Sequence, residues 1–160
     1  MPFTISQPGD YHLARNLTYN GSGDAILITA SNVTLTGAGF TLTGNATNEG
    51  VEVRGDSQVT VTGVRAAGFF IGIGPPDGAS YDTGSATVVQ DNTASNNQVG
   101  ILVDANSAGN KLLHNTAQGN TMFDLEDDNL KPCQNGWANN LYGTDNEMGL
   151  NQGSMFGCIR

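Results

Sequence analysis

The sequence contains few charged residues, and most of those are acidic. Only 13% of its 160 residues are charged, and six Lys and Arg stand against fifteen Asp and Glu, which gives a formal net charge of −9. Such a surface repels polyphosphates, which argues against a nucleic acid partner. It also repels acidic polysaccharides unless a cation bridges the two sets of carboxylates, whereas a neutral glycan meets no such repulsion.

Histidine, cysteine and long apolar runs are also scarce. Two histidines are too few for a His-rich copper or zinc centre. No run is long enough to span a bilayer, and no apolar signal-peptide core follows Met1, so an exported form would have lost or exchanged its leader. The cysteines, Cys133 and Cys158, lie close together near the C-terminus. Their placement suits a disulfide and a secreted, periplasmic or cell-surface location, while two buried free thiols are the alternative.

Glycine, asparagine and threonine are abundant instead, with 22 glycines alone. Glycine and asparagine disfavour helix interiors, whereas threonine suits strands, so the composition predicts a nearly all-β chain. A length of 160 residues with 38% hydrophobic content fits one domain with a narrow core.

An internal repeat indicates how the strands of this all-β chain are arranged. The text TVVQDNTASNN-QVGILVDAN, residues 87–106, returns as NKLLHNTAQGN-TMFDLEDDN, residues 110–129. Similarity at such a short period, without helical spacing, predicts a β-solenoid of about five coils with three short strands each. The apolar second-strand positions then form one column across the chain, and the asparagines three positions later predict a ladder at a coil corner. The apolar column is Leu35, Val61, Val89, Leu112 and Trp137, and the ladder is Asn92, Asn115 and Asn140.

The solenoid prediction divides the single domain, residues 1–160, into parts. We expect an N-terminal cap strand over 1–20, coils over 21–129, and a C-terminal cap over 130–160 that the disulfide ties down. Residues 74–84 interrupt the third coil. Insertions in solenoids project outward as loops, often over the working face.

Several stretches resemble the right-handed parallel β-helix superfamily typified by pectate lyases. They are PGDYHLARNLTYNGSGDAILITASNVTLTGAGFTLTG, NNQVGILVDANSAGNKLLHNTAQGN and CQNGWANN. They look most like its Asn-rich branch, which includes carbohydrate-binding and sugar-hydrolysis domains. The resemblance implies a pectin-lyase-like fold. It does not imply one activity, because the superfamily contains lyases, hydrolases, epimerases, phage tailspikes and non-enzymatic surface proteins.

Strand alternation predicts a polar stripe on the outside of one sheet. If the apolar residues Val51, Val53, Ile71, Ile73, Ile101, Val103, Phe123 and Leu125 point inward, their neighbours point outward. A sugar could lie on the stripe, with carboxylates accepting hydroxyl hydrogen bonds and Tyr81 of the insertion stacking on the ring. The alternative is a solvated face that keeps the rod soluble. The predicted ligand-binding residues are Glu52, Arg54, Gly72, Gly74, Tyr81, Asp104, Asp124 and Glu126, with Leu102 also on the stripe.

Three arrangements on or near this stripe could carry chemistry. Asp104 and Asp124 on adjacent coils could form the carboxylate pair of a glycoside hydrolase, and Arg54 is the best basic candidate for a lyase. Oxygen ligands from Asp124, Glu126 and Asp128 could hold calcium, the one cofactor that the sequence suggests. His114 and Asp91 occupy equivalent places in adjacent coils, which suits either a general base with its orienting carboxylate or simple corner packing.

These observations favour an exported β-helix that binds a polysaccharide or oligosaccharide, or serves as a surface recognition scaffold, without complete catalytic machinery. One alternative is a polysaccharide lyase or glycoside hydrolase that uses Glu52, Arg54, Asp104 and Asp124. Another is a structural module whose stack ends or faces self-associate into a homo-oligomer.

Overall fold

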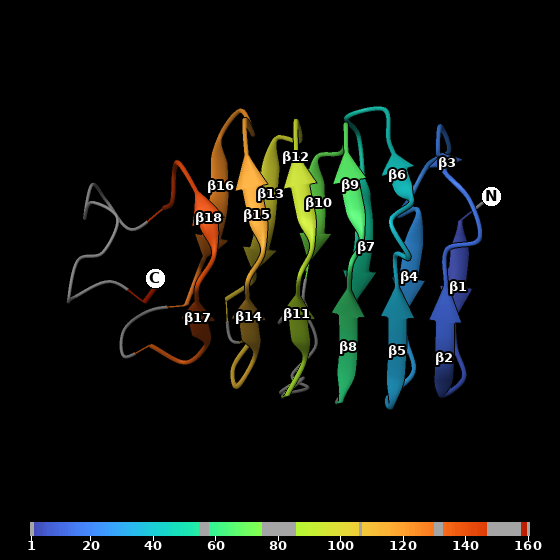
Figure 1. Cartoon of the computed structure of the whole chain (residues 1–160), viewed down its shortest axis with the longest axis horizontal. Helices are drawn as coiled ribbons and strands as arrows, with labels where there is room; N and C mark the ends of the chain where they lie inside the picture. The colour runs from blue at the N-terminus through green and yellow to red at the C-terminus, as the bar shows by residue number, and fades with distance from the viewer. Residues whose placement is uncertain are drawn as a thin grey trace.

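The computed structural model describes residues 2–54, 58–74, 86–105, 107–129, 133–146 and 158–159. They form three parallel sheets that wind around one axis, and each sheet has six strands (Figure 1). Sheet A contains β1 (Phe3–Ile5), β4 (Ile26–Ile28), β7 (Glu49–Val53), β10 (Ile71–Gly74), β13 (Val99–Val103) and β16 (Phe123–Asp127). Sheet B contains β2 (Gly9–His12), β5 (Val33–Thr36), β8 (Val59–Thr62), β11 (Val88–Gln90), β14 (Lys111–Leu113) and β17 (Gly136–Ala138). Sheet C contains β3 (Leu17–Thr18), β6 (Thr41–Thr43), β9 (Arg65–Ala67), β12 (Thr93–Ser95), β15 (Thr116–Gln118) and β18 (Leu141–Tyr142).

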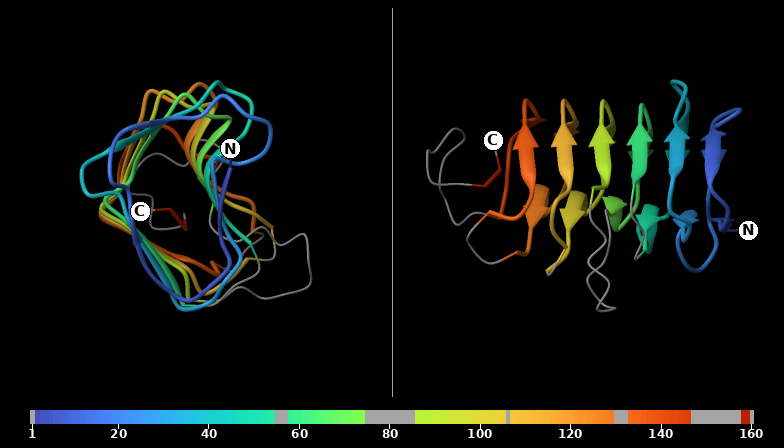
Figure 2. Two further views of the ribbon diagram at one scale, coloured as in Figure 1. Left: turned by 90° about the vertical axis from the view of Figure 1, so that its right-hand side faces the viewer. Right: turned by 90° about the horizontal axis from the view of Figure 1, so that it is seen from below.

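The all-β solenoid is therefore confirmed, with one strand of each sheet in every coil (Figure 2). The six strands of each sheet exceed the five coils expected from the sequence. The extra coil is the segment assigned to an N-terminal cap, because β1, β2 and β3 each add a first strand to a sheet. In the predicted C-terminal cap, β17 and β18 likewise extend sheets B and C.

Valine, leucine and isoleucine fill the interior in columns, one residue per coil. The predicted second-strand column is confirmed, since the register pairs Leu35 with Val61, Val61 with Val89, Val89 with Leu112 and Leu112 with Trp137. All five are buried. β-Branched and aliphatic side chains suit these short strands, and stacking them hides apolar surface that a single coil could not cover.

Asparagines join the coils at the corners. In the predicted ladder, Asn92 N and Nδ2 both donate to Asn115 Oδ1 at 3.1 Å, and Asn115 N and Nδ2 donate to Asn140 Oδ1 at 2.9 and 3.0 Å. The amides also donate to the carbonyls of Val61 and Val89. Backbone groups of a tight corner that the strands leave unpaired are satisfied in this way.

Two further ladders run along the other corners. Asn97 N donates to Asn120 Oδ1 at 2.9 Å, and Asn110 N donates to Asn135 Oδ1 at 3.1 Å. Both end on an aspartate of β16, the first on Asp124 and the second on Asp127. Side chains of the repeated segments thus join the coils at all three corners near the C-terminal end, whereas apolar Val59, Val64 and Phe69 occupy the corresponding corners of the coil formed by β7, β8 and β9.

The disulfide between Cys133 and Cys158 is present, so the alternative of free thiols is wrong. Tyr81 and residues 75–84 of the predicted insertion lie outside the described residues, as do 130–132 and 147–157 of the predicted cap. In the described part of the chain, no helix is long and apolar enough to cross a membrane.

Candidate ligand-binding face

The outer face of sheet A carries both acidic and apolar side chains, in an arrangement that differs from the predicted stripe. The register aligns Glu52, Gly74, Leu102 and Glu126 in one outward column. A second apolar group, formed by Ile71, Val99 and Leu102, is buried but separate from the main core. Ile71 therefore does not point into the main core as alternation predicted.

Strict alternation fails because each of these strands bends as it leaves the corner. A Cβ at Gly72 would lie 2.7 Å from Asn97 Nδ2 and 3.1 Å from Ala94 Cβ, so position 72 faces the interior. Position 73 also faces inward, since Ile73 is fully buried in the main core. Because positions 72 and 73 both face inward, the outward positions of the strand no longer alternate with the inward ones. The first inward position of β7, β10 and β13 has space for only a small side chain. Those residues are Gly50, Gly72 and Gly100.

Asp124 occupies this inward position in β16, and its prediction as a surface ligand is corrected accordingly. The side chain is 3% exposed. Its Oδ1 accepts hydrogen bonds from Asn120 N and Nδ2, and its Oδ2 accepts hydrogen bonds from the amides of Gly143 and Thr144 at 2.9 and 3.0 Å. Asp124 thus ends a corner ladder.

The predicted pair of Asp104 with Asp124 and the predicted calcium ligands Asp124, Glu126 and Asp128 do not assemble. Asp124 faces inward, while Glu126 lies on the outer column. Among the described residues, no group of three or more His, Cys, Asp or Glu side chains could hold a metal ion.

Glu52 and Arg54 do lie together, and they are joined by Asp24, which the sequence analysis missed. Arg54 Nε and Nη2 donate to the two carboxylate oxygens of Glu52, each at 2.8 Å, and Nη2 lies 3.8 Å from Asp24 Oδ2. Burial of Glu52, followed by its hydrogen bond with Asp24, raises the pKa of Glu52 to about 7. Below this pKa Glu52 is mainly protonated, which reduces its repulsion with Asp24, and Arg54 contacts both carboxyls.

A second acidic group lies at the other end of the face. Glu126 is partly buried, and its pKa is raised to about 6 by that burial and by the nearby charges of Asp128 and Asp104. Asp104, another residue of the predicted stripe, thus lies near enough to Glu126 for their charges to interact. We call Asp104, Glu126 and Asp128 the acidic edge.

Exposed apolar side chains lie at the opposite end of the same strands. Phe70 immediately precedes β10 and is 42% exposed, and Met122 immediately precedes β16 and is 50% exposed. Phe123 follows as a partly buried neighbour in register with Val99, so it is not a main-core residue as predicted. We call Phe70, Met122 and Phe123 the apolar edge. The sequence places Phe70 and Met122 directly before two strands of this sheet, but strand alternation alone does not show which way they point.

Asp91 and His114 occupy the turn between sheets B and C, away from this face. Both are exposed and adopt positive φ values, 56° and 54°, and Asn139 follows in the next coil with φ 56°. His114 Nε2 lies 3.3 Å from Asn139 Nδ2. Their position favours the corner-packing interpretation, because a left-handed backbone is what this tight bend requires.

The fold and this face define a parallel β-solenoid with an amphipathic outer sheet surface. The family model for the right-handed beta helix region matches residues 5–152, so the chain belongs to that family. No curated protein and no solved structure gives a significant match.

Proposed function

We propose that this β-helix binds carbohydrate along the outer face of sheet A. The observation that carries the proposal is the pairing of an apolar edge with an acidic edge on one rigid sheet. Sugars have the matching chemistry, because their C–H faces pack on apolar or aromatic groups while their hydroxyls donate to carboxylates. Ile71, Val99 and Leu102 between the edges are buried, so a glycan would contact the exposed side chains of the two edges.

The charge of the chain favours a neutral glycan. The net charge is −9, and the acidic edge would repel uronates directly. Arg54, the cation of this face, already contacts Glu52 and Asp24. A neutral oligosaccharide avoids this repulsion, and adjacent coils about 4.8 Å apart offer it repeated contacts.

A glycan array, followed by calorimetry with the best neutral oligosaccharide, tests the proposal. Phe70→Ala and Glu126→Gln should each weaken binding roughly 5- to 10-fold, the size expected for one stacking contact or one hydrogen bond. Leu141→Ala is the matched control, because Leu141 is 56% exposed on sheet C and should leave affinity unchanged. Equal losses in all three variants, or no neutral ligand at all, would contradict the proposal.

Glycoside hydrolysis is a second candidate, and the raised pKa of Glu126 favours it. A carboxyl with a pKa near 6 is substantially protonated at mildly acidic pH and can therefore donate a proton to the leaving oxygen. Asp104 or Asp128 would supply the second carboxylate. Glu52 is less suited, since its hydrogen bond with Asp24 leaves no room for a sugar between the two carboxyls. Release of new reducing ends that Glu126→Gln abolishes would establish hydrolysis. Unsaturated products would instead indicate a lyase.

We also propose that the protein is exported. The disulfide supports this, because such bonds persist in secreted, periplasmic and cell-surface proteins and are rare in the cytosol. Thiol labelling of cell fractions, read by mass spectrometry, should find Cys133 and Cys158 oxidised outside the cytosol. Recovery of the native protein in the cytosol with both thiols reduced would contradict export.

A further inference from the structure

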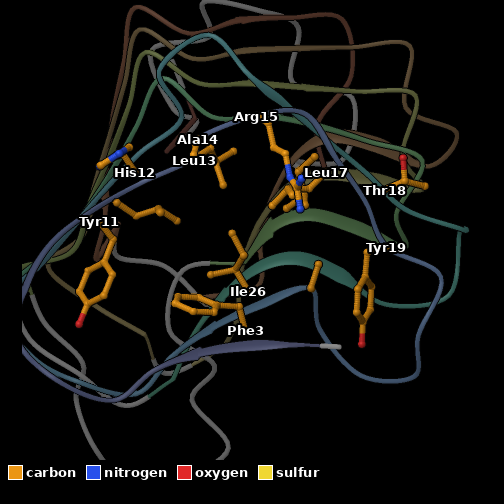
Figure 3. A pocket seen from close by; sticks show the side chains of 13 residues that line it. Phe3, Tyr11, His12, Leu13, Ala14, Arg15, Leu17, Thr18, Tyr19 and Ile26 are labelled. Carbon is orange, nitrogen blue, oxygen red and sulfur yellow. The ribbon is translucent and has the colours of Figure 1, made fainter.

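A second concave site lies at the N-terminal end of the solenoid, far along the rod from the acidic edge. A cavity of about 480 Å³ opens there, within the range of roughly 300–1,000 Å³ that is typical of small-molecule sites. Residues of the first coil and of β4, β5 and β6 line it (Figure 3). Leu13, Ile26, Leu35 and Leu42 lie behind its surface as buried side chains, and Phe3, Tyr11 and Leu17 present apolar surface to it.

The tyrosine hydroxyls of the wall are bonded to backbone, and its other polar side chains are those of His12, Arg15 and Thr18. Tyr11 Oη donates to the carbonyl of Gln7 at 3.1 Å, and Tyr19 Oη donates to the carbonyl of Ser22 at 2.9 Å. Both hydroxyls are thus already engaged with backbone outside the cavity lining, and the rings contribute carbon. The rings of Phe3 and Tyr11 together with Leu17 thus offer apolar surface to a hydrocarbon chain.

Arg15 gives the site a charge preference. In the close view its side chain projects from the rim toward the centre of the ring of lining residues (Figure 3). It is exposed and forms no ion pair with a described residue, and the described lining residues include no Asp or Glu. In a chain of net charge −9, this is a local cation beside an apolar cavity. An anionic group on the ligand would complement it.

From these features we propose that the cavity binds a fatty-acid-like ligand, with its acyl chain against Phe3, Tyr11 and Leu17 and its carboxylate on Arg15. A neutral hydrocarbon would use the wall and leave Arg15 unused. A polyanion would meet the acidic surface beyond the single guanidinium. The site is independent of the glycan face, so either can be disproved without the other.

Calorimetric titration with decanoate, below its micelle concentration, tests the inference. We expect saturable 1:1 binding that Arg15→Gln weakens roughly 5- to 10-fold, the loss of one charge-assisted contact. Decanol, which has the same chain without the charge, should bind both proteins equally. Arg65→Gln is the charge-matched control, since Arg65 is exposed on β9 and does not line the cavity.

A second variant blocks the cavity without touching the buried wall. Ala14 is exposed and lines the cavity, so Ala14→Trp should fold normally and abolish binding of both decanoate and decanol. Absence of saturable decanoate binding to the unmodified chain would overturn the inference, as would an equal loss in Arg65→Gln. Light scattering that shows a dimer, dispersed by Ala14→Trp, would also overturn it, because a second copy would then be the occupant.

Discussion

At the scale of single residues, the buried carboxyl of Glu52 links folding to pH. Its pKa is raised to about 7 in the folded chain from an ordinary value of 4.5, so the folded state keeps a proton that the unfolded state releases between these values. Its contribution to stability is complete below about pH 4.5 and is lost as pH rises toward 7. We predict that Glu52→Gln flattens the fall in melting temperature between pH 5 and pH 7.5.

Glu126 supplies the control for this experiment, because its pKa is raised only to about 6. Glu126→Gln should reduce the fall in melting temperature only between about pH 4.5 and 6, and should preserve the fall that Glu52 causes up to about pH 7. An unchanged slope in Glu52→Gln, measured by thermal unfolding across the series, would show that Glu52 ionises like an exposed carboxyl.

Asp124 shows a different role for a carboxylate, since it only accepts hydrogen bonds within the fold. Asp124→Ala leaves the backbone amides of Asn120, Gly143 and Thr144 without the acceptor provided by a buried carboxylate, and we predict a loss of about 2–4 kcal/mol in the free energy of unfolding. Urea denaturation measures it. Asp128→Ala, at an exposed position on the same segment, should cost less than about 1 kcal/mol. Equal costs would contradict the structural role of Asp124.

At the scale of elements, the ladders decide how the coils stay together. Asn115 accepts from Asn92 N and Nδ2 and donates to Asn140 and to the carbonyl of Val89, so Asn115→Ala breaks the ladder in its middle. We predict a cost of about 2–4 kcal/mol by urea denaturation. Asn139→Gly is the matched control, because Asn139 is exposed at a positive φ that glycine tolerates, and it should change stability little.

The same elements show how far the sequence could lead. The period located Leu35, Val61 and Val89 on one column, because register in a solenoid follows directly from the repeat. The period could not show the bend at Gly72. A pattern of alternating residues gives no sign that two successive positions, 72 and 73, both face inward. Asp24 was missed for another reason: it lies outside any strand, and only the three-dimensional stacking of coils brings it to Arg54.

At the scale of the whole molecule, the Cys133–Cys158 bond fixes the C-terminal end of the stack. It closes a loop with a sequence separation of 25, which in the chain-entropy view stabilises the folded state by about 3–4 kcal/mol. We predict that the Cys133→Ser/Cys158→Ser double variant loses this amount in urea denaturation. Because each coil contacts mainly its neighbours, hydrogen exchange should rise first in β17 and β18 and least in β5 and β8. Uniform exchange along the rod would mean instead that the coils unfold as one cooperative unit.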